Sequence, residues 1–193
     1  SDGNRLLAGG YIFMSDIVGN PSLMNKLGRV IATVYKNKEI DAVVTVATKG
    51  IPVAYAIASI LNKPVITIRR DNKVTEGNTV AINYVSGSTK KIETMILSKR
   101  SLNNHSKVLL VDDFMRGGGV LTGMESLMNE FDVEVIGKVI LTQCYDSPRE
   151  HEHDYLYLSK IENIDEYNST FDVKIGNVIE KLKEVEKEDL TNE

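Results

Sequence analysis

The segment from residue 41 to residue 70 constrains the fold more than any other part of the chain. DAVVTVA (41–47) is short, continuous and rich in β-branched residues, as is typical of a strand buried on both faces. An apolar helix pattern, IPVAYAIASIL (51–61), follows it, and the strand PVITIRR (64–70) comes next. This order is a β-α-β unit, which predicts a parallel sheet with helices on its faces.

A second unit of the same kind lies further along the chain. It runs from the strand KVLLVDD (107–113) through the helix LTGMESLMNEF (121–131) to the strand EVIGKVILTQ (134–143). The apolar spacing of this helix predicts a buried stripe made of Leu121, Met124, Leu127, Met128 and Phe131. The fold class is therefore α/β.

Helices are also expected near both ends of the chain. Asn20 can cap a helix over 20–36 that has Pro21 in its first turn. One face of this helix is expected to carry Leu23, Leu27, Val30 and Val34. Two strand-like pieces, DYLYLS (154–159) and FDVKIG (171–176), precede a charged helix over 177–189. The expected apolar face of that last helix consists of Val178, Ile179, Leu182 and Val185.

Residues 71–106 interrupt this rhythm with two weaker strand candidates, TVAINYVS (79–86) and KIETMILS (91–98). A long excursion from an α/β sheet is usually a functional flap or a dimer arm. A solvated hairpin is the alternative, and the sequence does not choose between them. The segment and its flank carry the basic residues Arg69, Arg70, Lys73, Lys90, Lys91, Lys99 and Arg100.

Length and composition exclude several classes of protein. A chain of 193 residues is expected to form one domain, spanning 1–193. The one cysteine, Cys144, excludes an internal disulfide and a cysteine-rich zinc site, which fits a cytoplasmic location. A net charge of −4 gives no global basic surface for nucleic acid, and no apolar run is long enough for a membrane helix. His105, His151 and His153 form no metal-ligand pattern.

The stretch VLLVDDFMRGGGVLTG (108–123) joins two adjacent carboxylates to three glycines between a strand and a helix. Free backbone N–H groups at such a helix start favour a phosphate, and carboxylates suit hydroxyl groups or a divalent cation. Together these groups fit a ribose 5-phosphate. A plain tight turn beside helix-capping aspartates remains the alternative. The glycines do not match the dinucleotide-binding or P-loop spacings.

VLLVDDFMRGGGV resembles the ribose-phosphate loop of the type I phosphoribosyltransferases. The resemblance implies that Asp112 and Asp113 hold the ribose hydroxyls, and a bound Mg²⁺, of phosphoribosyl pyrophosphate (PRPP). It assigns the 5′-phosphate to Arg116, Gly117, Gly118, Gly119 and Val120. The family usually has Thr or Ser within and at the end of this loop, where this chain has Gly117 and Val120.

A closer resemblance covers nearly the whole chain. GGYIFMSDIVG, VATKGIPVAYA, RRDNKVTEGNTVAINYVSGS and DDFMRGGG are similar to the effector domain of the purine operon repressors of Gram-positive bacteria. It implies a type I phosphoribosyltransferase fold: a central, mostly parallel sheet flanked by helices, with a flexible β-arm and a small hood. In that family a winged-helix DNA-binding domain precedes this domain, and this chain begins after it. The resemblance implies that transferase activity has been lost and that the old active site serves as a sensor.

The resemblance implies roles for further residues. It places the pyrophosphate loop at Ala47, Thr48, Lys49 and Gly50. Lys73 lies in the segment that matches the flexible loop and is expected to reach a phosphate. Tyr11, just before the first helix, Phe114 and Met115 are assigned to the flanks of the ligand. An ordinary strand-to-helix turn at 47–50, a half-buried Tyr11 and a core Met115 are the alternatives.

The leading expectation is therefore a purine repressor effector domain, without a catalytic residue of its own. PRPP, with Mg²⁺, or a guanosine tetraphosphate-like nucleotide would control operator DNA binding through the N-terminal domain. A homodimer is expected from the same resemblance, with no membrane association. The alternatives are an active purine phosphoribosyltransferase of the xanthine or adenine type, and a dimerisation scaffold with a vestigial site.

Overall fold

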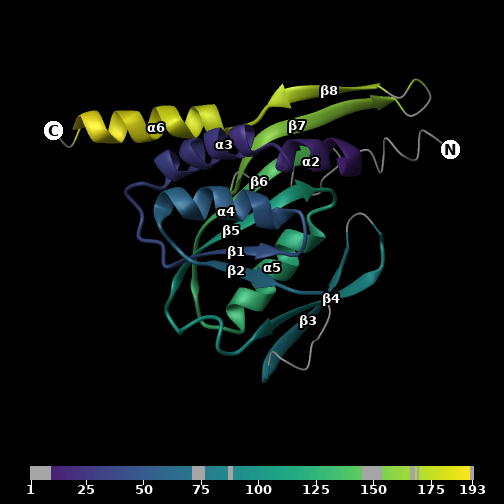
Figure 1. Ribbon diagram of the computed structural model, residues 1–193, viewed down its shortest axis with the longest axis vertical. Helices are drawn as coiled ribbons and strands as arrows, with labels where there is room; N and C mark the ends of the chain where they lie inside the picture. Colours follow the sequence, from purple (N-terminus) through teal and green to yellow (C-terminus); the bar gives the residue numbers. More distant parts are fainter. Residues whose placement is uncertain are drawn as a thin grey trace.

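A six-stranded sheet forms the centre of the molecule (Figure 1). The computed structural model describes residues 10–70, 77–86, 89–144, 154–165, 168 and 170–191. In spatial order the strands are β2 (Val65–Ile68), β1 (Ala42–Val46), β5 (Lys107–Met115), β6 (Glu134–Cys144), β7 (Leu156–Asp165) and β8 (Thr170–Ile175). Neighbouring strands are parallel except for β7 and β8, which run antiparallel. The predicted mostly parallel sheet is confirmed.

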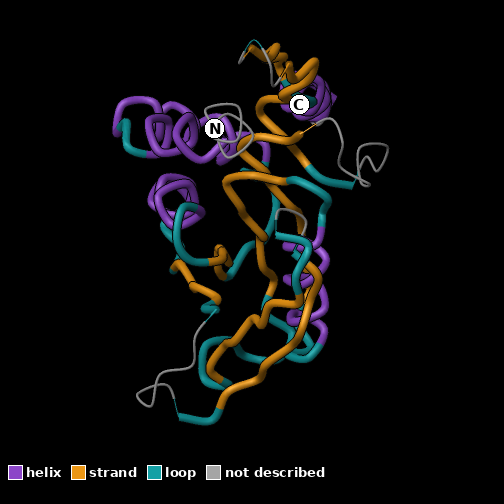
Figure 2. The backbone as a smooth tube through the Cα atoms, turned by 90° about the vertical axis from the view of Figure 1, so that its right-hand side faces the viewer, coloured by secondary structure: helices purple, strands orange, loops and turns teal. Residues whose placement is uncertain are grey.

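Helices cover both faces of this sheet (Figure 2). One face carries α2 (Gly10–Val18), α3 (Pro21–Val34), α4 (Gly50–Leu61) and α6 (Val178–Thr191), and the other carries α5 (Gly119–Asn129). Alternate residues of one strand enter the two cores: Val43 packs with α3 and α4, and Val44 packs with α5. No helix in the described part of the chain is long and apolar enough to cross a membrane.

The predicted helices exist, with small corrections to their buried faces. The Asn20 side chain caps α3 by accepting from the Leu23 N–H at 3.1 Å, as predicted. Leu23 itself is 40% exposed, because the face of α3 that packs on α4 is centred on Leu27 and Ile31. In α6, Ile179 is likewise 45% exposed, whereas Val178 and Val185 are buried. All five residues of the predicted second-unit stripe are buried, but α5 ends at Asn129, two residues before the predicted end, so Phe131 lies just beyond the helix.

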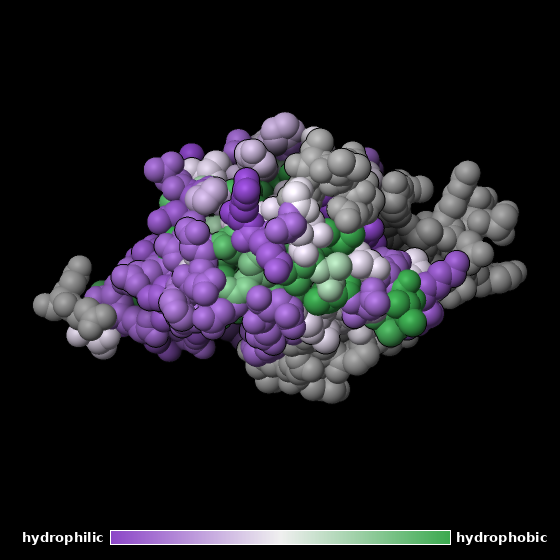
Figure 3. All heavy atoms as spheres, turned by 90° about the horizontal axis from the view of Figure 1, so that it is seen from below, coloured by the Kyte–Doolittle hydropathy of each residue, from purple (hydrophilic) through white to green (hydrophobic). Residues whose placement is uncertain are grey.

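The 71–106 excursion contains an antiparallel hairpin of β3 (Thr79–Val85) and β4 (Ile92–Ser98), which forms its own two-stranded sheet. Its inner face packs against α5 and buries Tyr84, Met95 and Leu97. A β-bridge between Arg69 and Ile96 ties it to the end of β2. The hairpin is therefore packed on one face rather than fully solvated. Seen from the hairpin end, apolar atoms lie among polar ones (Figure 3).

Candidate functional site

The two aspartates lie inside β5 rather than at its end, where the sequence predicts them. β5 continues to Met115, two residues beyond the predicted end, because Phe114 and Met115 pair with Thr142 and Gln143 of β6. Asp112 consequently pairs with β6 in the sheet, and it is only 6% exposed. Its Oδ1 accepts a hydrogen bond from the Asp113 N–H at 2.9 Å.

Burial dominates the electrostatics of this pair. It raises the pKa of Asp112 well above the ordinary value of 3.8, and the charge of Asp113 raises it further. Burial also raises the pKa of Asp113. The positive charges of Arg70 and Lys49 oppose these two shifts, respectively, without outweighing burial. A ligand that donates hydrogen bonds or carries positive charge would therefore stabilise the ionised form of these two buried carboxyls.

The glycine loop follows directly on β5. α5 begins at Gly119, two residues earlier than predicted, so Gly119 and Val120 belong to its first turn. Gly117 and Gly118 have φ of +74° and +70°, a left-handed conformation that side-chain-bearing residues rarely adopt. That conformation explains why glycine rather than Thr stands at 117. Gly118 provides no side-chain cap, so the first N–H groups of α5 are open to an anion.

The Ala47–Gly50 loop leaves β1, the neighbour of β5, at the same edge of the sheet. Its Ala47–Thr48 peptide bond is cis, and α4 begins at Gly50. A Cβ on Gly50 would stand 3.3 Å from Asp112 Oδ1, so the backbone of this loop lies close to Asp112. The structure thus brings together the two stretches that were separately predicted to hold pyrophosphate and ribose. Lys49 is the N-cap residue of α4 but does not cap the helix with its side chain, and burial lowers its pKa.

Thr45 is a residue of this site that the sequence analysis missed. It is fully buried, and its Oγ1 has no hydrogen-bond partner among the residues that the structure describes. The same hydroxyl would lie 2.2 Å from a Cβ on Gly50, so it borders the loop and the carboxylate together. The available signal was one hydroxyl in the otherwise apolar strand AVVTV.

The other predicted ligand residues are placed less centrally or lie outside the described residues. Lys73 lies outside the residues that the structure describes. Tyr11 lies inside α2, not before the first helix as expected, and its side chain is also outside the description. Phe114 is half-buried against the α3–α4 core, while Met115 is 3% exposed and packs in the α5 core.

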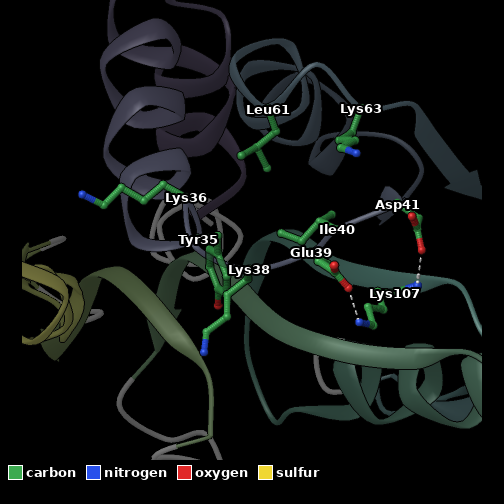
Figure 4. Close-up of a pocket in the computed structure, with 9 residues that line it drawn as sticks. All are labelled: Tyr35, Lys36, Lys38, Glu39, Ile40, Asp41, Leu61, Lys63 and Lys107. Atoms are coloured by element: carbon green, nitrogen blue, oxygen red, sulfur yellow. Dashed lines mark hydrogen bonds and ion pairs between the residues drawn. The ribbon is translucent and has the colours of Figure 1, made fainter. Parts of the chain in front are cut away.

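A separate pocket of about 520 Å³ lies at the opposite, amino-terminal edge of the sheet (Figure 4). It lies at the ends of α3 and α4 and at the starts of β1 and β5, and its lining comprises Tyr35, Lys36, Lys38, Glu39, Ile40, Asp41, Leu61, Lys63 and Lys107. Lys107 bonds Glu39, and Lys36 bonds Asp189 of α6. Lysines beside the ends of two helices also complement the helix dipoles.

The chain resembles known proteins over most of its length. The phosphoribosyl transferase domain family matches residues 14–175. A probable purine biosynthesis transcriptional regulator PurR of Streptococcus pneumoniae is 48% identical over 95% of this chain and 67% of its own length. The purine biosynthesis transcriptional repressor PurR of Bacillus subtilis is 46% identical (93% and 63%), and the purine biosynthesis transcriptional activator PurR of Lactococcus lactis is 47% identical (91% and 65%).

A solved structure agrees with the fold. The adenine phosphoribosyltransferase of Thermoanaerobacter pseudethanolicus superposes with a TM-score of 0.62 at 16% identity, over 73% of this chain and 80% of that one. The chain spans about two thirds of the length of the curated regulators that it matches. It belongs to the phosphoribosyltransferase domain family and, within that family, to the phosphoribosyltransferase-like effector domains of the PurR regulators of purine biosynthesis.

Proposed function

We propose that this domain is a sensor that binds PRPP, and competitively a guanosine tetraphosphate-like nucleotide, between the Ala47–Gly50 loop and the Asp112–Val120 segment. In the intact regulator this binding controls the affinity of a preceding DNA-binding domain for operator DNA, with PRPP opposing repression. Both ligands present ribose hydroxyls and two phosphate clusters, so one pocket suits both. Neither is converted to product.

The contact between Gly50 and Asp112 carries this proposal. It sets a helix start that suits pyrophosphate beside carboxyls that suit ribose hydroxyls. The start of α5, with no side-chain cap, supplies a second phosphate position two residues beyond the left-handed Gly117. Relatives described as transcriptional regulators support a regulatory rather than an enzymatic outcome.

A Mg²⁺ that accompanies PRPP fits the aspartate pair only in part. Two carboxylates offer the oxygen ligands that Mg²⁺ prefers, and a cation would offset the burial and the charge of Asp113 that raise the pKa of Asp112. Among the described residues no group of three acidic, His or Cys side chains could hold a metal ion alone. The remaining ligands would therefore come from PRPP and water.

Calorimetric titration with PRPP and Mg²⁺ tests the proposal. We expect binding by the wild-type chain that the double substitution Asp112→Ala/Asp113→Ala abolishes. The double substitution Glu180→Ala/Glu184→Ala is the control, because it removes two carboxylates from exposed positions of α6. A parallel titration with guanosine tetraphosphate, alone and after PRPP, tests whether the two ligands compete.

Pyrophosphate release in the presence of adenine, guanine or xanthine decides the chemistry. Binding without release supports the sensor. Steady release with one of these bases would instead make the domain an active purine phosphoribosyltransferase. Failure of the wild-type chain to bind either ligand would leave a scaffold with a vestigial site.

A further inference from the structure

Glu93 of β4 is the centre of a cluster of side chains that ties the hairpin to the main sheet. Its Oε2 accepts from Tyr84 Oη at 2.8 Å and from Arg70 Nη1 at 2.9 Å, and its Oε1 accepts from Thr89 Oγ1 at 2.8 Å. Tyr84 and Thr89 belong to the hairpin itself, whereas Arg70 follows β2 of the six-stranded sheet. The Arg70–Glu93 ion pair therefore joins two separate sheets.

This cluster lies at the carboxyl edge of the sheet, where the proposed site is. β2 is the neighbour of β1, whose carboxyl end opens into the Ala47–Gly50 loop. The charge of Arg70 acts on Asp112, since it lowers the pKa of that carboxyl. Tyr84 also packs against α5, the helix that follows the glycine loop, because a Cβ on Gly123 of α5 would lie 3.0 Å from Tyr84 Cγ.

The ion pair is weak enough to be exchanged. The Arg70 side chain is 45% exposed and the Glu93 side chain 21% exposed, and pairs with such exposure contribute little to stability. A guanidinium has five N–H donors, and it binds a phosphate group more strongly than it binds one carboxylate oxygen. A ligand with a pyrophosphate group near the Ala47–Gly50 loop would therefore compete with Glu93 for Arg70.

We propose that Glu93 is a positioning residue that competes with the pyrophosphate group of the effector for Arg70. Without effector, Glu93 holds Arg70 against the hairpin, and with effector Arg70 turns to the phosphate and the link between the hairpin and β2 loosens. This inference rests on the proposed function, and it adds that the hairpin responds to occupancy of the site. Competition from Glu93 also makes the affinity for the effector lower than it would be if Arg70 were free to bind the phosphate.

The test compares PRPP with ribose 5-phosphate, which lacks the pyrophosphate group, in titrations of four variants. Glu93→Gln keeps the size of the side chain and one oxygen acceptor, for either Tyr84 or Thr89, but loses the charge that holds Arg70. We expect this substitution to raise the PRPP affinity by about threefold to fivefold and to leave the ribose 5-phosphate affinity unchanged. Glu162→Gln is the matched control, since Glu162 is also an ion-paired strand carboxylate, 17% exposed, on β7.

Arg70→Gln and the double variant Arg70→Gln/Glu93→Gln complete the cycle. Arg70→Gln alone is expected to lower the affinity for PRPP and to leave the affinity for ribose 5-phosphate unchanged. This test does not depend on whether the Glu93 variant folds. In the Arg70→Gln background the gain from Glu93→Gln should disappear. A gain that persists there would mean that Glu93 merely repels the ligand, and it would overturn the proposal. So would an unchanged PRPP affinity in Glu93→Gln.

The two hypotheses fail in different ways. If the wild-type chain does not bind PRPP, the proposed function fails and this inference with it. If the wild-type chain binds PRPP but the cycle shows no coupling between Arg70 and Glu93, the sensor stands and the competition between Glu93 and phosphate is wrong.

Discussion

Charged groups gather at both ends of the parallel strands, the amino-terminal edge and the carboxyl-terminal edge of the sheet. The two edges differ in whether these charges are paired. At the amino-terminal edge, Lys107 bonds Glu39 and Lys36 bonds Asp189. At the carboxyl-terminal edge, Asp112 and Asp113 are adjacent carboxyls whose pKa values burial raises. At the first edge, these two lysines are each paired with a carboxylate of the chain itself. The second is arranged at a cost in folding free energy, which a ligand can recover.

The helix starts show the same difference. Asn20 caps α3 with its own side chain. The two helices that start at the carboxyl edge of the sheet, α4 and α5, have no side-chain cap hydrogen bond. Thr45, also at that edge, has a buried hydroxyl with no hydrogen-bond partner in the described part of the chain. A protein that leaves such groups unpaired in several elements at one place is expected to use them for binding.

The strongest test of this difference inserts one methyl group at each edge. A Cβ on Gly50 would meet Thr45 Oγ1 at 2.2 Å, and a Cβ on Gly137 would meet the Tyr35 hydroxyl of the other pocket at 2.3 Å. Both Gly50→Ala and Gly137→Ala should lower the free energy of unfolding by about 1–3 kcal/mol, measured by urea denaturation. Only Gly50→Ala should also weaken PRPP binding, by about tenfold or more.

The two glycine variants control for each other, because each crowds one edge of the same sheet. Equal losses of PRPP affinity in both would show that binding depends on general stability. The distinction between the two edges would then be lost.

Protonation provides the next test. Because the folded pKa of Asp112 is raised above 3.8, the folded chain binds more protons than the unfolded chain between 3.8 and that folded value. The free energy of unfolding should therefore fall as the pH rises through this window. Asp112→Asn removes this penalty, so it should stabilise the chain at neutral pH by on the order of 1–3 kcal/mol, with a gain that shrinks toward pH 4.

Glu39→Gln is the control from the amino-terminal edge. The contribution of Glu39 to the free energy of unfolding depends on pH with the opposite sign. The hydrogen bond and charge of Lys107 lower the pKa of Glu39 below 4.5, so its contribution is present at neutral pH and is lost as the pH falls. Urea denaturation of both variants between pH 4 and pH 8 measures the two slopes. A gain in Asp112→Asn that does not depend on pH would contradict the account of the aspartate pair.

The sequence was sufficient for the architecture, because continuous β-branched strands and a 3.6-residue apolar period report burial directly. It also marked the Asp112–Gly119 stretch by its adjacent acids and three glycines, and the family resemblance pointed to the Ala47–Gly50 loop. It missed Thr45 and Glu93. Their roles depend on which residues the β1 and β4 registers bring near the site, namely Gly50 for one and Arg70 for the other. Such pairings between distant segments leave no local pattern in the sequence.

Val120→Thr is expected to have the smallest effect. Val120 lies in the first turn of α5 and is partly buried against the α5 core, at a position where the resembled family has Thr. A hydroxyl there adds one donor to a phosphate, which should raise the PRPP affinity by about fivefold. Val135→Thr is the matched control, because Val135 is also a partly buried valine of the same core but lies at the amino-terminal start of β6. If calorimetry shows the same PRPP affinity in both variants and the wild type, the first turn of α5 does not touch the phosphate. The site would then rest on the Ala47–Gly50 loop and the two aspartates alone.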